Sequence, residues 1–229
     1  MFLSPRLFSV SCLFGFVLLF IVSGCQKLDE DGGYIDEKTN RYVYVKPKHI
    51  APKDYRSAVR QPRPGEPQTI KAKVVRLDAD LKSLWVAIVD RQSYQLLAET
   101  MSKGNRDDIK KQLRLHLKFV SPLGSVEKPS FKKKWSDYTK KRLEAQLSQK
   151  DILAEIHYQA KSRQLNAYVS LSVKNAQGKE AIRNINQWMI FEGLSYFFLE
   201  DASPDEIKYY NQAQSLAKDR RAGLWKYQR

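Results

Sequence analysis

The 229-residue sequence is poor in the residue types that build zinc sites and disulfides. It has 2 cysteines and 3 histidines, and these do not cluster with the spacing of zinc ligands. A glycine-rich phosphate loop and a nucleophile elbow are also missing. The sequence therefore argues against a zinc enzyme, a P-loop nucleotide hydrolase and an α/β hydrolase.

The first 24 residues have the order of a bacterial secretion signal. Arg6 precedes an apolar run over 13–22, and about ten residues are too few for a helix to cross the ~30 Å hydrocarbon core of a membrane. The run ends in the motif I-V-S-G-C, which resembles the bacterial lipobox and closes at Cys25. We therefore expect cleavage before Cys25 and acylation of Cys25 with palmitate-type chains, which anchor the protein in a lipid bilayer. The alternatives are an ordinary signal peptide with an incidental cysteine, or a misread start of the chain.

Cleavage would leave a strongly basic chain in the cell envelope. Loss of Arg6 lowers the formal net charge from +15 to +14, and loss of Cys12 together with acylation of Cys25 leaves no disulfide. Position 26 is glutamine, whereas an aspartate there often retains lipoproteins in the inner membrane, so the sequence favours the outer membrane. The protein could lie on the periplasmic or on the surface-exposed face of that membrane. Basic charge in this compartment suits nucleic acid, anionic lipid or an acidic envelope polymer, and composition does not choose among them.

The distribution of proline and hydrophobic residues, together with the signal, divides the chain into three segments. Five of the nine prolines lie within 26–68, which predicts a lipidated cysteine and an extended tether over 25–68, after the signal at 1–24. The remaining 69–229 has enough hydrophobic residues for one core. Within the tether, the apolar stretch 42–45 is open to three interpretations: a short strand, a partner-binding segment or local packing.

Hydrophobic periodicity predicts an α+β domain. We expect strands first, then a basic amphipathic helix, two strands and two helices. Ser203 is a good N-cap for the last helix, because Pro204 and two acidic residues follow it. The expected strands are 70–77, 84–89, 94–98, 113–120, 152–158 and 165–173; the expected helices are 131–143, 182–193 and 204–221.

Two motifs near the C-terminus carry a family resemblance. Residues 186–195 read N-Q-W-M-I-F-E-G-L-S and residues 217–225 read A-K-D-R-R-A-G-L-W, and both resemble signatures of the staphylococcal nuclease-like family. The resemblance covers 69–225 and implies an OB-like five-stranded β-barrel with three helices. Independently of the family, Gly193 and Gly223 are placed to end helices in the left-handed conformation.

The resemblance also implies where catalysis would reside. Active members use calcium held by carboxylates, a glutamate that assists water and two arginines that stabilise the phosphate. The stretch 78–81, D-A-D-L, resembles the first site motif and makes Asp80 the candidate metal ligand. The stretch 162–168, S-R-Q-L-N-A-Y, resembles the last motif and supplies Arg163.

The middle motif departs from the family. With Pro122 as the anchor, Leu115, Val120 and Leu123 stand where arginine, aspartate and glutamate are expected. Arg114 is one residue away, and because strand side chains alternate between faces, it should point away from the site unless a bulge intervenes.

We therefore expect no efficient nuclease and no required cofactor. Calcium prefers six to eight oxygen ligands, and one aspartate with waters would bind it weakly. Loss of base, ligand and arginine together should remove most of the catalysis. The alternative is a calcium-dependent phosphodiesterase acting on extracellular DNA or RNA through Asp80, Arg163 and Arg114. Substitute carboxylates for that alternative are Asp107, Asp108 and Glu127.

Binding is the leading function predicted from the sequence, with a purely structural protein-protein role as a further alternative. A basic surface could contact nucleic acid or an anionic envelope surface, or its side chains could simply be solvated. We expect His116 to be a surface or edge residue, Trp85 to face a groove, and the other candidate tryptophans, 135, 188 and 225, to pack in the core. The basic residues are Lys132, Lys133, Lys134, Lys140, Lys141, Arg142, Lys218, Arg220 and Arg221.

Overall fold

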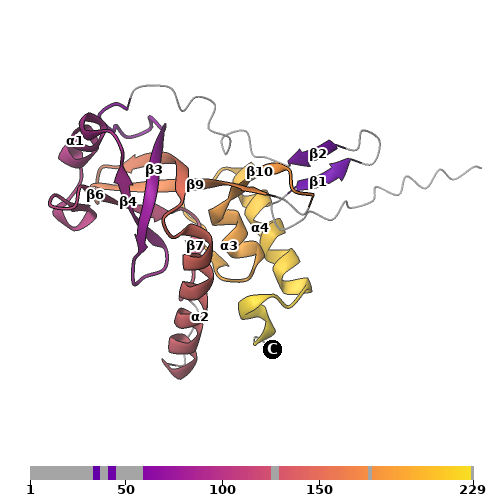
Figure 1. The fold of residues 1–229 in the computed structure, drawn as a ribbon. Coiled ribbons are helices and arrows are strands. Elements are labelled where there is room, and N and C mark those ends of the chain that lie inside the picture. The colour runs from indigo at the N-terminus through magenta and orange to yellow at the C-terminus, as the bar shows by residue number, and fades with distance from the viewer. Residues whose placement is uncertain (1–32, 37–40, 45–58, 125–128, 175–176, 228–229) are drawn as a thin grey trace, which may run out of the picture.

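A computed structural model of the chain describes residues 33–36, 41–44, 59–124, 129–174 and 177–227 (Figure 1). The predicted signal, Cys25, most of the tether and Glu127 lie outside the described residues. Two short strands are described within the tether region. β1 (Gly33–Asp36) pairs antiparallel with β2 (Arg41–Tyr44), so most of the apolar stretch 42–45 is a strand.

A closed sheet forms the centre of the domain. The strand order is β10-β9-β8-β3-β4-β6-β5, all antiparallel, and an additional parallel pairing of β6 with β9 closes β3, β4, β6, β9 and β8 into a five-stranded barrel. The predicted OB-like α+β fold is thereby confirmed. The strands are β3 (Gln68–Leu77), β4 (Ser83–Ile88), β5 (Arg106–Asp107), β6 (Gln112–Leu117), β8 (Asp151–Gln159), β9 (Gln164–Lys174) and β10 (Glu180–Asn184).

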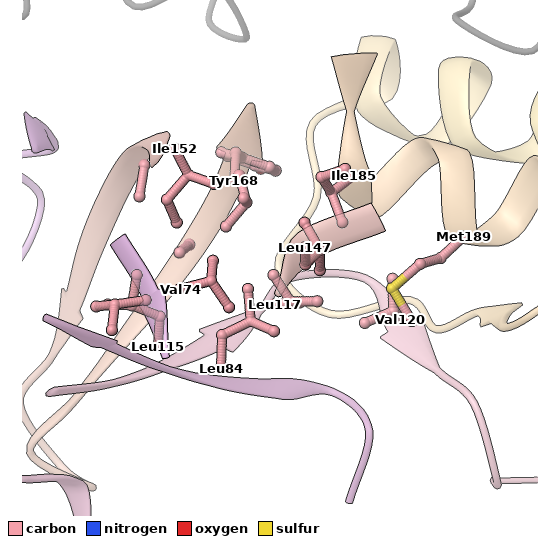
Figure 2. Close-up of a cluster of buried hydrophobic side chains, with 14 of the residues drawn as sticks. Val74, Leu84, Leu115, Leu117, Val120, Leu147, Ile152, Tyr168, Ile185 and Met189 are labelled. Carbon is pink, nitrogen blue, oxygen red and sulfur yellow. The ribbon is translucent and has the colours of Figure 1, made fainter. Parts of the chain in front are cut away.

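Alternating apolar residues fill the barrel. On β6, Leu113, Leu115 and Leu117 are buried, as the alternation in the sequence predicts. Figure 2 shows Leu115 and Leu117 among side chains from β3, β4, β8 and β9, with Leu147 and Met189 reaching in from two helices. A fully buried leucine contributes about 1.5–3 kcal/mol relative to an exposed one, so this cluster dominates the stability of the domain.

In the described residues, four α-helices accompany the barrel. The three predicted ones are α2 (Pro129–Leu147), α3 (Ile185–Phe191) and α4 (Pro204–Asp219), and the fourth is α1 (Arg91–Thr100). Short elements complete the domain: the 3-10 turns η1 (Lys103–Asn105) and η2 (Gly223–Lys226), and a small sheet of β7 (Val120–Ser121) with β11 (Tyr196–Phe197). Within the described parts of the chain, no helix is both long and apolar enough to span a membrane.

The strand predicted over 94–98 is wrong, because these residues belong to α1. Tyr94, Leu97 and Ala98 are its buried residues, and their spacing is that of one helix face. The Asp90 side chain accepts a hydrogen bond from the Ser93 amide at 2.7 Å and caps the helix. The short apolar run over 94–98 fits the two-residue period of a strand as well as the 3.6-residue period of a helix. The N-cap at Asp90 favours the helix.

The helix predicted over 182–193 begins too early. Residues up to Asn184 form β10, in which Ala181 and Arg183 are buried, the two-residue period of a strand. Asn184 then caps α3 by accepting a hydrogen bond from the Gln187 amide at 2.8 Å. By contrast, the predicted N-cap at Ser203 is confirmed, and Glu206 completes a capping box there.

The tryptophans divide differently from the prediction. Trp85 is buried, with the Arg76 guanidinium 4.3 Å from its ring centroid, so the prediction that it faces a groove is wrong. Trp135 and Trp188 are buried as predicted. Trp225 is only half buried, and its neighbour Leu224 occupies the core position instead.

Candidate functional site

The turn between β3 and β4 carries two aspartates. The Leu81 amide donates to the Asp78 carbonyl at 3.1 Å, and the Asp78 amide donates to the Ser83 carbonyl at 2.9 Å. Leu81 adopts φ 57°, a left-handed conformation that is costly for leucine, and its side chain is buried. Burial of this side chain fixes the turn and, with it, the positions of the carboxylates of Asp78 and Asp80.

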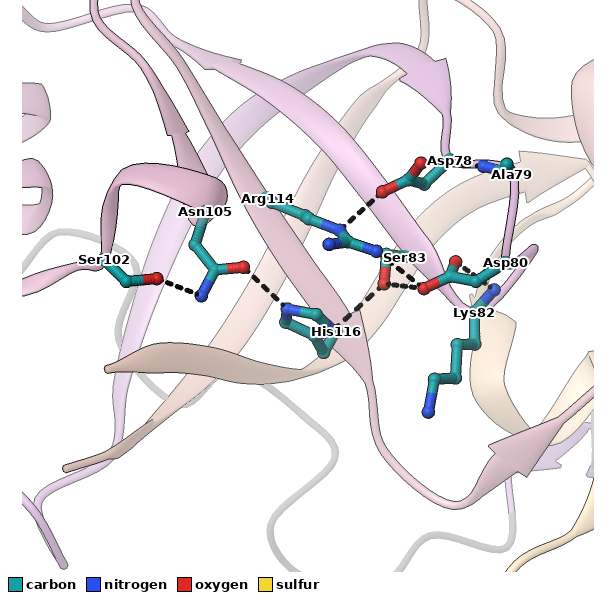
Figure 3. A network of polar contacts seen from close by, with 9 residues as sticks. All are labelled: Asp78, Ala79, Asp80, Lys82, Ser83, Ser102, Asn105, Arg114 and His116. Atoms are coloured by element: carbon teal, nitrogen blue, oxygen red, sulfur yellow. Dashed lines mark hydrogen bonds and ion pairs between the residues drawn. The ribbon is translucent and has the colours of Figure 1, made fainter. Parts of the chain in front are cut away.

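Arg114 lies between these two carboxylates (Figure 3). Its Nε is 2.5 Å from Oδ2 of Asp78, and its Nη2 is 2.8 Å from Oδ2 of Asp80. Asp80 also accepts hydrogen bonds from the Lys82 amide through Oδ1 at 3.0 Å and from the Ser83 hydroxyl through Oδ2 at 2.8 Å. Both oxygens of Asp80 are therefore engaged by the protein itself.

The prediction that Arg114 points away from Asp80 is wrong. Arg114 pairs with Trp85 across β4 and β6, and its side chain lies on the face opposite Leu115, as alternation requires. The error lay in the position assumed for the carboxylates. The turn places Asp78 and Asp80 on the Arg114 face, directly after a register shift in β3.

His116 continues this polar network on the same face of β6. Its Nδ1 is 3.0 Å from the Ser83 Oγ and its Nε2 is 3.1 Å from the Asn105 Oδ1. The Asn105 amide nitrogen donates to the Ser102 hydroxyl at 2.9 Å and to the Arg163 carbonyl at 3.3 Å. A continuous chain of contacts thus joins Asp80 on one side of β6 to η1 on the other.

The network assigns the proton on His116. A carbonyl oxygen faces the Asn105 nitrogen, so Asn105 presents its oxygen to His116, and Nε2 must carry the hydrogen. Nδ1 of the neutral ring is then an acceptor, and it shares the single hydroxyl hydrogen of Ser83 with Oδ2 of Asp80. Burial, followed by the positive charge of Arg114, lowers the pKa of His116 to about 4, so the ring is neutral at pH 7.

His116 is therefore not the surface or edge residue that its sequence position suggested. β6 is paired on both sides at this point, with Ser83 on β4 and with Asn166 on β9. Ser83 is 0% exposed, so the Ser83–His116–Asn105 chain resembles a catalytic triad only in composition. A substrate cannot reach the serine hydroxyl, and we interpret the chain as structural support for Asp80.

Comparison with known proteins agrees with this architecture. Residues 115–227 match the family described as Staphylococcal nuclease homologue. The domain therefore has the staphylococcal nuclease-like OB-fold. Among solved structures, it is similar to the extended Tudor domain of Drosophila melanogaster Tudor-SN (p100), with 10% identity over 70% of this chain and 100% of that chain and a TM-score of 0.44. At that level the structural likeness carries no argument about function. The search of curated proteins found no match.

Arg163, the candidate phosphate-binding arginine of this nuclease-like domain, points to α1. Its Nε donates to the Thr100 carbonyl at 3.0 Å, and Nη2 lies 3.3 Å from the Glu99 carbonyl and 3.4 Å from that of Met101. These are carbonyls at the C-terminal end of α1, which have no partner within the helix. The structure therefore brings Asp80 and Arg114 together and uses Arg163 as a helix cap.

The substitute carboxylates are also engaged. Asp108 accepts a hydrogen bond from the Tyr94 hydroxyl at 3.0 Å and lies 3.2 Å from Nε of Arg106. Burial and Asp108 together raise the pKa of Tyr94 to about 12. Asp107 accepts from the Lys110 amide at 2.9 Å. Nowhere in the described ranges do three or more His, Cys, Asp or Glu side chains gather as metal ligands.

The predicted basic residues fall into two groups. Some have structural partners: Arg142 forms an ion pair with Glu192 at 2.9 Å, and Arg220 lies 3.8 Å from the Phe191 ring and donates to its carbonyl. Lys218 lies 4.7 Å from the ring centroid of Trp225. All nine are exposed, and Lys140 also lies 3.9 Å from Glu144 in a surface ion pair; the others on α2 and after α4 are Lys132, Lys133, Lys134, Lys141 and Arg221.

Ser83 and Asn105 were not predicted from the sequence. A serine at the start of a strand and an asparagine in a turn are common residues with no motif around them. Only the pairing of β4 with β6, together with the return of the chain through η1, places both beside His116.

Proposed function

We propose that this nuclease-like domain binds nucleic acid through its basic surface without the calcium-dependent cleavage of active family members, and that acylated Cys25 anchors it to the cell envelope. The observation that carries the proposal is the position of Arg114 between Asp78 and Asp80. A guanidinium occupies the place where a calcium ion would need those carboxylates.

The chemistry of the turn supports this interpretation. Calcium takes six to eight oxygen ligands and gains most of its binding energy from anionic ones. Here the positive charge of Arg114 already offsets the negative charge of one carboxylate, and Asp80 has two further hydrogen-bond partners, the Lys82 amide and the Ser83 hydroxyl. A cation would have to displace Arg114 and leave the guanidinium, which is only about a quarter exposed, without its partners.

Charge supports the binding role. The chain has a formal net charge of +15, and five lysines lie exposed along α2. Phosphate contacts by such residues release counterions, so affinity should fall steeply as salt increases, with a slope set by the number of phosphates contacted. The same side chains would suit an anionic polymer of the envelope.

Cleavage is the first test. Purified full-length chain is incubated with plasmid and with labelled single-stranded DNA, with calcium and with chelator. We expect no calcium-stimulated cleavage. Cleavage that disappears with chelator and in the Asp80→Ala variant would overturn the proposal and establish the calcium-dependent phosphodiesterase instead.

Binding is the second test. A salt titration of DNA affinity should give a negative slope that becomes shallower when Lys132, Lys133 and Lys141 are changed together to glutamine. Absence of binding at low ionic strength would remove the nucleic-acid role. Anchoring is tested by labelling cells with radioactive palmitate: the wild-type chain should be labelled and sediment with membranes, and the Cys25→Ser variant should not.

A further inference from the structure

A groove lined by aromatic rings lies between α2 and η2, formed by residues outside the Asp80–Arg114 network. Its volume is about 530 Å³, within the ~300–1,000 Å³ range of small-ligand sites. Its lining residues are Phe131, Lys134, Trp135, Tyr138, Gly223, Lys226 and Tyr227.

The aromatic side chains of the groove form one continuous cluster. The rings of Phe131 and Trp135 are nearly parallel, with centroids 6.2 Å apart and an interplanar angle of 14°. Tyr138 lies at one end, 5.2 Å from Trp135 and tilted by 34° to it, and Tyr227 contacts Phe131 edge-on at the other end, at 5.3 Å and 64°. Trp135 is 4% exposed, whereas Tyr138 and Tyr227 are 47% and 59% exposed. The rings of the two tyrosines are therefore accessible to a ligand, and the buried ring of Trp135 forms the base of the groove.

Lysine side chains lie beside the aromatic rings of the groove. Lys134 and Lys226 line the groove and are exposed, and Lys132 and Lys133 continue the charge along α2. Flat aromatic surfaces combined with lysines match the two parts of a nucleotide, a base that stacks and a phosphate that needs a cation. A bilayer surface would be met by apolar side chains that protrude, and here the largest one, Trp135, lies buried at the floor.

We propose that this groove is a binding site for single-stranded nucleic acid, in which unpaired bases stack on Tyr138 and Tyr227 while Lys134 and Lys226 contact the phosphates. The proposal rests on the nucleic-acid binding proposed above and assigns it a place and a substrate class. Bases in a duplex are stacked on one another and cannot enter, so the groove selects single strands.

The test compares a fluorescently labelled oligothymidylate with a duplex of equal length, measured by anisotropy with the full-length chain. Stacking of one base is worth about 1–3 kcal/mol, so Tyr138→Ala and Tyr227→Ala should each weaken single-strand binding about tenfold and leave duplex binding unchanged. Tyr138→Phe should retain the affinity, because stacking needs the ring and not the hydroxyl. Phe198→Ala is the matched control, an aromatic residue of similar exposure on a different loop.

Three results would contradict the proposal that this groove binds single-stranded nucleic acid. One is unchanged single-strand affinity in the double tyrosine variant while the wild-type chain still binds in a salt-dependent way, which leaves the proposed function intact. Another is an equal loss in Phe198→Ala. The third is no oligonucleotide binding together with tyrosine-dependent retention on vesicles of anionic phospholipid, which would refute the nucleic-acid role as well and make the groove a membrane contact.

Discussion

Gly193 and Gly223 contact each other through their backbones, with no room for a side chain between them. The Leu224 amide donates to the Gly193 carbonyl at 2.9 Å, and both glycines have positive φ. A Cβ on Gly193 would lie 2.3 Å from the Ala222 carbonyl oxygen, and one on Gly223 would lie 2.4 Å from the Gly193 oxygen. This contact holds the segment around Gly223, which begins η2, against the turn that follows α3.

Alanine at either glycine should therefore destabilise the domain. The left-handed conformation alone costs about 1–2 kcal/mol for a residue with a side chain, and the contact with rigid backbone adds to it. We expect Gly193→Ala to lower the free energy of unfolding by about 3 kcal/mol, measured by urea denaturation. Gly178→Ala is the matched control, because Gly178 has φ +74° but nothing within 4 Å of its Cβ position. Equal costs at the two positions would show that the backbone contact contributes nothing.

Arg163 should stabilise α1. Arg163→Ala removes the donors that satisfy carbonyls at the end of that helix, and we expect a loss of about 1–2 kcal/mol in the free energy of unfolding. Hydrogen exchange should show faster exchange confined to α1 and η1. The exposed neighbour Lys161 serves as the control, since Lys161→Ala should change neither quantity. Unchanged stability in Arg163→Ala would leave its side chain free for a phosphate.

The Arg114–Asp80 pair can be measured directly with a double-mutant cycle. Because both side chains are partly exposed, we expect a coupling energy of about 1–2 kcal/mol between Arg114→Gln and Asp80→Asn in urea denaturation. Arg114→Gln should also free two carboxylates for a cation. Calcium should then raise the melting temperature of this variant and leave that of the wild-type chain unchanged; a calcium-dependent rise in the wild-type chain would contradict the assignment.

Acid should weaken the fold through His116. Its pKa in the folded domain, about 4, lies below the ordinary value of 6.5, so the unfolded chain binds more protons between these two values. The stabilising contribution of the neutral ring is fully present above pH 6.5 and is lost as the pH falls towards 4. His116→Gln should flatten this part of the stability profile. Equal slopes in the wild-type chain and His116→Gln would refute the assignment.

Long periodic segments were predictable from the sequence. Alternation on β6 and the capping signals of α4 are local, and both appear in the structure as expected. The segment 94–98 was not, because its short apolar run fits both a helix and a strand. The cap at Asp90 and contacts with distant strands decided it.

The candidate site was less predictable than the fold. The sequence identified Asp80, Arg114 and Arg163 one at a time, and alternation along β6 correctly separated Arg114 from Leu115. It could not show that the turn at Leu81 folds both aspartates onto the Arg114 face, nor that Arg163 reaches back to α1.

The sequence by itself determined the composition of this protein's surface and core: its basic charge, its apolar periodicity, and the two glycines required where the backbone turns left-handed. These properties depend on residues that are near neighbours along the chain. Only the tertiary structure decided which charges are neutralised and which remain available. Arg114 meets Asp78 and Asp80, Arg142 meets Glu192, and the aromatic rings of α2 meet Tyr227 through contacts between residues 34 to 96 positions apart, whose geometry no local pattern encodes.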